Sequence, residues 1–301
     1  MIVLHRTDPI HTQHMLACER AAEVVNQQAA VFVARAEAGQ WDQDPEEIHG
    51  ARVASRRLRA ALRVFKDVLP DQVTAVQPEL KWIAGLLGAV RDLDVQVRRL
   101  QTTAADVGVA QEVMPYGGWL EALRERDLAA LDEATHTPRF GELVHALANV
   151  HFPTPRDAEQ LTVEDFAPAR LRRSAKKLRK LARSLDHTSA DTALHEARIR
   201  AKRLRYASEF FEPTYGKPAR RLISAATDLQ DLLGDHQDGV VNTGHVHEAI
   251  ATAAAAWPAE TSLALGRLVQ WENQHRAEIR RRFKTAYGDV EDAWRRLGKA
   301  M

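Results

Sequence analysis

Two segments of the chain carry the same string of one histidine and several basic residues. The first runs from His49 to Arg59 and the second from His195 to Arg205, and both follow the pattern H-x-x-R-x-x-x-[RK]-R-L-R. Arginine presents several N–H donors in a planar fork that suits phosphate oxygens, and lysine adds a point charge. These residue types therefore predict a site for a phosphate-bearing anion.

A helical wheel at roughly 100° per residue places the basic residues of each string on one helix face. The first face holds His49, Arg52, Arg56, Arg59 and Arg63, and the second holds His195, Arg198, Lys202 and Arg205. Glu209 stands in the second segment where Arg63 stands in the first. Few carboxylates lie at i+4 to neutralise these faces, although like charges at that spacing are destabilising. We therefore interpret both faces as anion-binding surfaces and not as solvated helix surfaces.

A third basic segment lies at 166–185. There, one face of a predicted helix carries Arg172, Lys176, Arg179 and Arg183. Between Pro168 and Tyr206 the chain has 13 Lys or Arg and 3 Asp or Glu, whereas its formal net charge is only +1. Charge is thus segregated along the chain, and we expect the second half to contribute more of the anion site.

The two strings belong to a longer internal repeat. Segment 49–92 aligns with segment 195–238 without a gap, at a constant offset of 146 residues. The shared residues include Phe65 with Phe211, and Leu-Leu-Gly at 86–88 with Leu-Leu-Gly at 232–234. The repeat predicts two similar helical bundles related by a pseudo-two-fold axis, one over residues 10–150 and the other over 160–297.

The spacing of apolar residues predicts an all-α fold. They recur at three- and four-residue intervals with little strand-like alternation, and proline, glycine and aspartate mark the breaks. The expected helices are 10–38, 46–69, 78–104, 116–135, 138–150, 166–185, 191–212, 217–236, 239–255 and 261–297. Asp92 and Asp238 follow the Leu-Leu-Gly sequences, which we interpret as turns. Each carboxylate is expected to cap a helix or to hold a histidine or arginine in place.

Other kinds of site find little support in the sequence. Cys18 is the only cysteine, which excludes an internal disulfide and a thiol-rich metal site and is typical of a reducing cytoplasm. No Gly-x-x-x-x-Gly-Lys-[Ser/Thr] loop occurs, and the pairs His11/His14 and His245/His247 lack acidic partners at ligand spacing, so we expect them at the surface. No apolar stretch is typical of a signal peptide or a membrane span. We expect a soluble, cytoplasmic binding protein without catalytic residues, metal, cofactor or membrane contact.

Two alternative ligands stay open at this point. Nucleic acid would also bind through its phosphates, but it favours stacking aromatics among the basic residues, and Tyr206 is the only aromatic residue close to either string. An acidic protein partner would need the basic residues to be spread over a convex surface. The roles of His49 and His195 are also open. Each either contacts the anion, where its pKa would rise, or orients neighbouring helices by hydrogen bonding.

The repeated strings resemble the conserved-histidine α-helical domain (CHAD) family, as do L-G-x-x-R-D-L-D at 87–94 and L-L-G at 232–234. The resemblance extends from about residue 10 to 297 and implies a single CHAD domain over 1–301. It further implies two four-helix bundles, a basic groove or pore between them that holds inorganic polyphosphate, and association with polyphosphate granules. Gln237 departs from the repeat, because the first half has Arg91 there. The Glu-x-Glu-x-Lys signature of the triphosphate-tunnel domain found in many relatives is absent.

The predicted polyphosphate site combines the two strings with the basic face of segment 166–185. The family resemblance carries its histidines and basic residues onto the strings, whereas segment 166–185 is assigned from its charge alone. The predicted site residues are His49, Arg52, Arg56, Arg57, Arg59, Arg63, Arg172, Lys176, Arg179, Arg183, His195, Arg198, Lys202, Arg203 and Arg205.

Overall fold

The computed structural model describes residues 15–41, 44–152 and 161–301. Regular structure within these ranges is helical, and an isolated antiparallel bridge pairs Leu16 with Thr162. The all-α fold predicted from the spacing of apolar residues is therefore confirmed. His11, His14 and the start of the predicted helix 10–38 lie outside the described residues.

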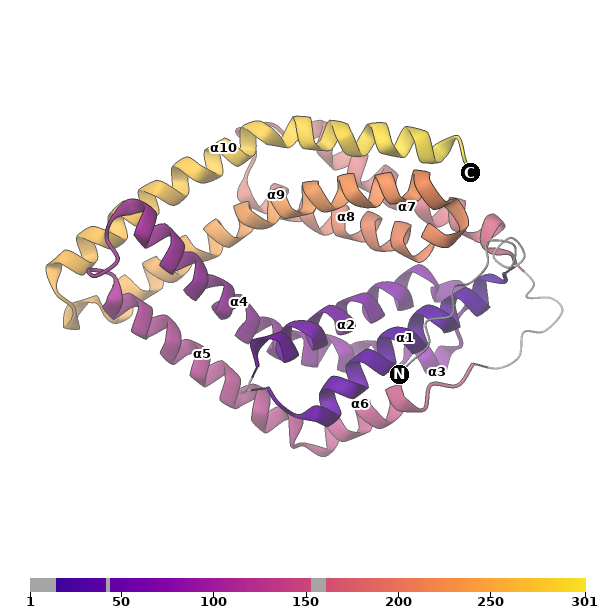
Figure 1. Ribbon diagram of the computed structural model, residues 1–301, viewed down its shortest axis with the longest axis horizontal. Coiled ribbons are helices and arrows are strands. Elements are labelled where there is room, and N and C mark those ends of the chain that lie inside the picture. Colours follow the sequence, from indigo (N-terminus) through magenta and orange to yellow (C-terminus); the bar gives the residue numbers. More distant parts are fainter. Residues whose placement is uncertain (1–14, 42–43, 153–160) are drawn as a thin grey trace.

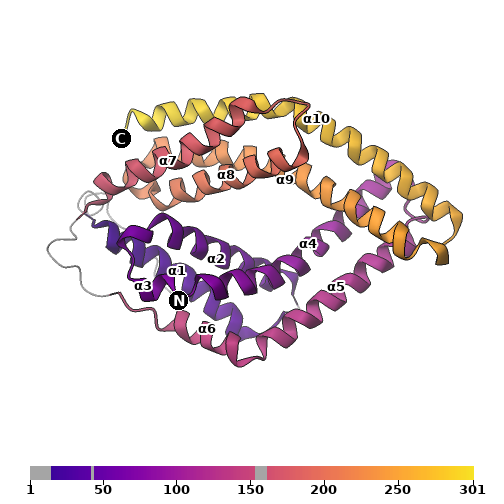
Figure 2. The same cartoon turned by 180° about the vertical axis from the view of Figure 1, so that it is seen from behind.

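The helices form two groups that face each other (Figures 1 and 2). The first group contains α1 (Ala17–Ala38), α2 (Pro45–Val64), the short α3 (Asp71–Thr74), α4 (Gln77–Val107), α5 (Met114–Thr135) and α6 (Pro138–Ala148). The second contains α7 (Val163–Ser184), α8 (Asp191–Phe210), α9 (Glu212–Thr252) and α10 (Ala259–Gly298). At one end of the molecule α4 and α5 reach α9 and α10, and toward the other end α2 packs against α8 (Figure 1).

Helices α2 and α8 carry the two basic strings, and local sequence determines where they begin and end. Asp44 caps α2, because its side chain accepts a hydrogen bond from the Glu46 backbone N–H at 2.8 Å, and Pro45 is the first helical residue. Both helices end at the repeated phenylalanine, and the fully buried rings of Phe65 and Phe211 meet edge to face, 5.5 Å apart. Helices α1 and α7, like α2 and α8, begin 146 residues apart and have equal lengths. The helix bounds therefore follow the offset of the sequence repeat.

The structure corrects the division of residues 217–255 into two helices. Instead of separate helices at 217–236 and 239–255, a continuous α9 runs past Gly239, and its non-helical residue is Gly216, with φ 54°. Gly239 marks the close approach of another helix, since a Cβ there would lie 2.6 Å from Glu272 Oε2 of α10. A glycine within a helical pattern can serve packing as well as a turn, and here it serves packing.

A second correction concerns the two Leu-Leu-Gly sequences. Gly88 lies inside α4 and Gly234 inside α9, so neither is part of a turn. Asp92 and Asp238 are consequently interior residues of these helices and do not cap them. The expectation that they cap helix starts is wrong.

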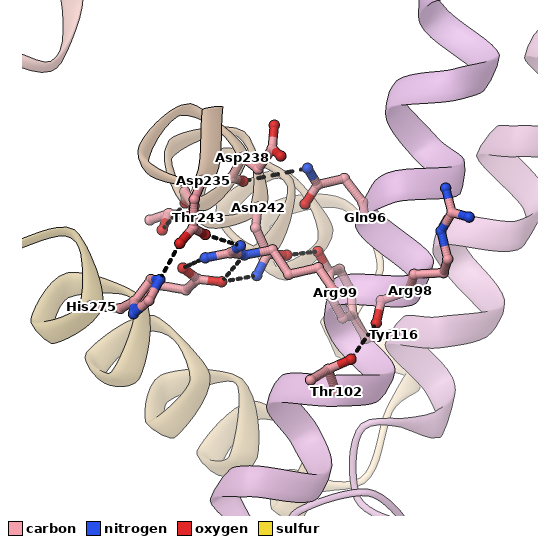
Figure 3. Close-up of polar contacts among 12 residues, drawn as sticks. Gln96, Arg98, Arg99, Thr102, Tyr116, Asp235, Asp238, Asn242, Thr243 and His275 are labelled. Carbon is pink, nitrogen blue, oxygen red and sulfur yellow. Dashed lines mark hydrogen bonds and ion pairs between the residues drawn. The ribbon is translucent and has the colours of Figure 1, made fainter. Parts of the chain in front are cut away.

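A buried polar network joins the two groups of helices at the end where α4 meets α9 and α10 (Figure 3). Arg99 of α4 donates two hydrogen bonds of 2.7 Å to the two carboxylate oxygens of Glu272 in α10, and a third of 2.7 Å to Asp235 in α9. Glu272 is fully buried, and Asn242 donates to it at 3.0 Å. His275 Nε2 lies 2.6 Å from Asp235 Oδ2. Burial opposes the charge on Arg99, but its hydrogen bonds to the two acids raise its pKa above the usual range.

We expect G239A and G244A to have opposite effects on stability, although both positions lie in α9. Alanine is favoured over glycine inside a helix by about 1 kcal/mol, and nothing lies within 4 Å of a Cβ at Gly244, so G244A should stabilise the protein. A Cβ on Gly239 would lie 2.6 Å from Glu272 Oε2 and 3.3 Å from Arg276 Cγ, so G239A should destabilise the protein by about 1–3 kcal/mol. Urea unfolding of both variants measures the difference. A G239A protein as stable as G244A would contradict the close approach of α9 and α10.

Candidate anion-binding site

Helices α2 and α8 bring basic residues of both strings into one group. We define the central cluster as Arg52, Arg56, Arg198, Lys202 and Arg205. The effect of this arrangement is largest at Lys202. Burial of its ammonium lowers its pKa, and repulsion from the four arginines lowers it further, to about 7. Two of these arginines come from α2 and two from α8. The contact between the helices therefore concentrates positive charge from both halves of the chain.

The donors of the central cluster are not all used within the protein. Burial lowers the pKa of Arg56, and the nearby Tyr206 hydroxyl opposes this change. Repulsion from three arginines of the cluster lowers the pKa further, namely Arg52, Arg198 and Arg205. The Nε atoms of Arg56, Arg198 and Arg205 are buried without a hydrogen-bond partner among the described residues. A buried donor left unpaired is destabilising by about 1–3 kcal/mol. An anion bound beside the cluster would reduce the repulsion among its charges.

Repeated glycines let one arginine of each string lie against a neighbouring helix. A Cβ on Gly88 of α4 would lie 3.8 Å from Arg52 Nε, and a Cβ on Gly234 of α9 would lie 3.6 Å from Arg198 Nε. Gly88 and Gly234 occupy equivalent positions of the repeat, as do the two arginines. The two arginines therefore lie beside equivalent glycines of α4 and α9.

The repeated aspartates lie next to the same two arginines. Asp92 Oδ1 accepts a hydrogen bond from Arg52 Nη2 at 2.8 Å. Burial raises the pKa of Asp238, and the nearby charge of Arg198 opposes this rise. Asp92 thus has the structural role of holding an arginine, which was one of the two roles expected from the sequence.

The two histidines lie in different surroundings. His195 Nδ1 lies 2.7 Å from Gln237 Oε1, and because an amide oxygen can only accept, Nδ1 carries the proton in this contact. In the first half Arg91 occupies the position equivalent to Gln237. Burial, followed by repulsion from Arg91, lowers the pKa of His49. The departure from the repeat noted in the sequence therefore gives each histidine its own environment.

Glu209 joins two arginines at the edge of the central cluster. Arg57 Nη2 lies 2.5 Å from Glu209 Oε2, and Arg205 Nε lies 3.6 Å from Glu209 Oε1. Because Glu209 stands where the first segment has Arg63, this acid makes the two halves of the site unequal. Arg57 is therefore neutralised by a neighbour, unlike Lys202.

Arg59, Arg63 and Arg203 extend the basic surface along α2 and α8. Burial lowers the pKa of Arg63, and repulsion from Arg203 and Arg59 lowers it further. Arg63 is thus close enough to both other guanidinium groups to be repelled by each. They continue the row of positive charge toward the C-terminal end of α2.

The predicted face of α7 is not part of the central cluster. Arg172, Lys176 and Arg183 are exposed, and Arg179 Nε pairs with Glu291 Oε1 of α10 at 3.1 Å. None of the four is among the charges that shift the pKa of Lys202 or Arg56. Their part in the site remains a prediction.

A different edge of α7 faces α2 and α8, and its residues were not among the predicted site residues. There, Arg170, Arg173 and Lys177 line a pocket together with Arg63, Arg200 and Arg203. The local charge of segment 168–206 was a signal for these residues. The helical wheel could not select this edge, because α7 carries basic residues on several sides.

Residues that could support other functions are sparse in the ranges that the structure describes. No group of three or more His, Cys, Asp or Glu gathers there into a possible metal site. None of the helices there is long and apolar enough to cross a membrane. His247 is exposed, whereas His245 is half-buried against Trp119, which corrects the expectation of a surface pair.

The all-α fold in two groups of helices and the repeated basic strings define a class of helical protein with a duplicated basic motif. The chain matches the CHAD domain family over residues 23–247, and it belongs to this family. Two curated proteins of Mycobacterium tuberculosis, Uncharacterized protein MT2285 (strain CDC 1551 / Oshkosh) and Uncharacterized protein Rv2226 (strain ATCC 25618 / H37Rv), are each 30% identical to it over 272 residues. The matches cover 85% of this chain and 49% of each relative, so the chain spans about half the length of the curated relatives it matches.

Two solved structures share the fold. The crystal structure of the CHAD domain from the plant Ricinus communis has a TM-score of 0.73 and 24% identity, and the match covers 92% of each chain. PptA from Streptomyces chartreusis has a TM-score of 0.67 and 20% identity, and the match covers 93% of this chain and 99% of PptA. At these identities the likeness establishes the fold.

Proposed function

We propose that this CHAD protein binds inorganic polyphosphate at the central cluster without changing it chemically. The observation that carries the proposal is the position of Lys202, whose pKa burial and four surrounding arginines lower to about 7. A cluster of this kind is destabilising without an anion and favourable with one. Polyphosphate suits it because every unit of the polymer brings negative charge and acceptor oxygens.

The arrangement supports binding along a line. The central cluster continues through Arg59 toward Arg63 and Arg203, whose charges repel one another in the free protein. A linear polyanion can neutralise successive groups in such a row, whereas a small anion would neutralise part of it. Association with polyphosphate granules would follow from this binding, and it forms part of the proposal.

The surroundings of Tyr206 favour a ligand without bases. Tyr206 is only 4% exposed, and the guanidinium of Arg205 lies 4.9 Å from the centre of its ring. Its face is therefore not available to stack against a base, which is how proteins bind single-stranded nucleic acid without sequence preference. Polyphosphate needs no such contact.

A calorimetric titration with long-chain polyphosphate, beside single-stranded RNA and DNA at matched phosphate concentration, tests the proposal. We expect tight binding to polyphosphate at physiological salt and much weaker binding to either nucleic acid. The logarithm of the binding constant should fall linearly with the logarithm of salt concentration, because bound phosphates release counterions. Equal affinity for all three ligands, or no binding to polyphosphate, would defeat the proposal.

Binding should also take up protons near neutral pH. Because the pKa of Lys202 in the free protein is about 7, part of its population is neutral just above that pH, and a bound polyanion favours the charged form. Affinity should therefore fall as pH rises above about 7, and K202R, which stays charged, should flatten the dependence. Calorimetry in buffers of different ionisation enthalpy counts the protons. A K202R profile as steep as that of the wild type would show that Lys202 is not the group responsible.

A further inference from the structure

A second basic pocket opens between α2, α7 and α8. It has a volume of about 160 Å³, and six of its lining residues are basic: Arg63, Arg170, Arg173, Lys177, Arg200 and Arg203. The other lining residues are Ala60, Val64 and Ser174, so no acid lines it in the part of the chain that is described. The pocket therefore presents a strong excess of positive charge to whatever enters it.

Two of the six basic residues are held by acids outside the pocket. Arg170 pairs with Asp67, and Arg200 Nε pairs with Glu196 Oε1 at 2.7 Å. Arg200 also donates to the backbone carbonyl of Lys177 at 2.9 Å. These contacts fix the two guanidinium groups in the wall of the pocket and tie α7 to α8.

The other four have no acidic partner among the described residues, namely Arg63, Arg173, Lys177 and Arg203. Burial and repulsion from Arg203 lower the pKa of Arg63. In the wall, Arg170 Nε is buried without a hydrogen-bond partner in the same set of residues. The pocket thus holds positive charge that no acid among the described residues compensates, which indicates an anion site.

The pocket is separate from the central cluster. Successive residues of a helix are about 100° apart, so Arg200 and Arg203 leave α8 on a different side from Arg198 and Lys202. Nothing from α7 contributes to the central cluster, whereas three basic residues of α7 line the pocket. The two sites meet at Arg59 and Arg63, whose charges interact.

The internal repeat does not account for the pocket. At the offset of 146 residues, Arg170, Arg173 and Lys177 correspond to Val24, Gln27 and Val31. Arg200 corresponds to Ala54, and Arg63 corresponds to Glu209. The position equivalent to Arg203 is Arg57, which Glu209 neutralises at 2.5 Å. Equivalent helices in the other half are therefore built without five of these six charges, so the fold does not require those five basic residues.

The lining of the pocket limits its ligand. It offers six basic side chains and a serine, but no aromatic ring on which a base could stack. Such a lining suits phosphate groups better than the base of a nucleotide. Six converging cations in such a space match a compact anion of high charge.

We propose that this pocket binds a compact anion of one or two phosphate groups. The anion is either free pyrophosphate or the terminus of a polyphosphate chain. The second source rests on the proposed function, because a chain along the row of Arg59 and Arg63 would place its end here. The first source does not depend on it.

Titration of the whole protein with inorganic pyrophosphate tests the pocket. We compare the wild type with R173A/K177A, which removes two exposed basic residues that no acid pairs with in the described structure. Pyrophosphate affinity should fall about tenfold or more, since each lost ionic hydrogen bond is worth roughly that factor. R282A/R296A removes two exposed arginines of α10 and serves as the control with equal loss of charge. Pyrophosphate that fails to bind the wild type, or binds R173A/K177A as tightly, would overturn the proposal.

Polyphosphate with free ends and with ends blocked as esters separates the two sources. If chain ends enter the pocket, blocking them should weaken binding to the wild type and leave binding to R173A/K177A unchanged. If blocking has no effect while pyrophosphate binding still depends on Arg173 and Lys177, the pocket takes free pyrophosphate. Failure of long-chain polyphosphate to bind at all would defeat the proposed function and leave the pyrophosphate result standing.

Discussion

Replacing Arg198, Lys202 and Arg205 together by alanine should lower the affinity for long-chain polyphosphate roughly a thousandfold, since each hydrogen bond to a charged group contributes at least about 1.5 kcal/mol and 1.4 kcal/mol is a factor of ten. The three residues supply the α8 side of the central cluster. Because the cations of the cluster repel one another in the free protein, their removal also relieves repulsion, and we expect the variant to fold. Helicity measured by circular dichroism should stay at the wild-type level.

The control for the R198A/K202A/R205A variant is R282A/R295A/R296A, which removes the same charge from exposed positions of α10. It should bind polyphosphate nearly as tightly as the wild type, because a general loss of positive charge acts weakly across a Debye length of about 8 Å at physiological salt. The loss of affinity with rising salt should also be less steep in R198A/K202A/R205A than in the wild type, and equally steep in the control. Equal losses in both variants would show that net charge, and not the central cluster, determines binding.

Replacing Arg99 by alanine should lower the free energy of unfolding by about 3–5 kcal/mol, because it leaves a buried carboxylate without its charged partner. The Glu272 side chain is 1% exposed and would keep the hydrogen bond from Asn242 as its remaining polar contact among the described residues. Asp235 would lose a donor as well. Hydrogen bonds from Arg99 and His275 outweigh burial and hold the pKa of Asp235 below its usual range. Urea unfolding at pH 7 measures the loss.

The double variant R99M/E272L distinguishes the stability lost through an unpaired buried charge from the stability lost through changed packing. Replacing both partners by apolar residues removes the unpaired charge, so its loss of stability should be clearly smaller than that of R99A. Arg281, which is exposed and pairs with Glu278 three residues earlier, is the control, and R281A should change stability by less than about 1 kcal/mol. An R99A protein as stable as R281A would show that the network of Figure 3 contributes little to joining the two groups of helices.

Most of the secondary structure could be predicted because it depends on local sequence. The start of α2 follows from Asp44 and Pro45, and its end from Phe65, each a residue at the end that it determines. The division of α9 failed because a glycine inside a helix has two explanations. Gly239 serves the approach of Glu272, a residue 33 positions later in the chain, and no local pattern reveals that contact.

The candidate site shows the same division. The basic faces of α2 and α8 could be assigned from the spacing of their residues. The difference between Gln237 and Arg91 at equivalent positions of the repeat already indicated that the two halves of the site are unequal. The helical wheel selected one edge of α7, yet the pocket with Arg63 lies at Arg170 and Arg173. A wheel gives the angle of each side chain around its own axis but not the direction in which the partner helix lies.

The sequence by itself determined the all-α class, the repeat at an offset of 146 residues and the types of residue that bind an anion, because helix periodicity and side-chain chemistry are local properties. Only the tertiary structure decided which charges meet. The lowered pKa of Lys202 arises from burial and from arginines of two helices whose strings are separated by more than a hundred residues. Electrostatic interaction depends on distance through space and on exclusion of water, and both are set when α2 packs against α8.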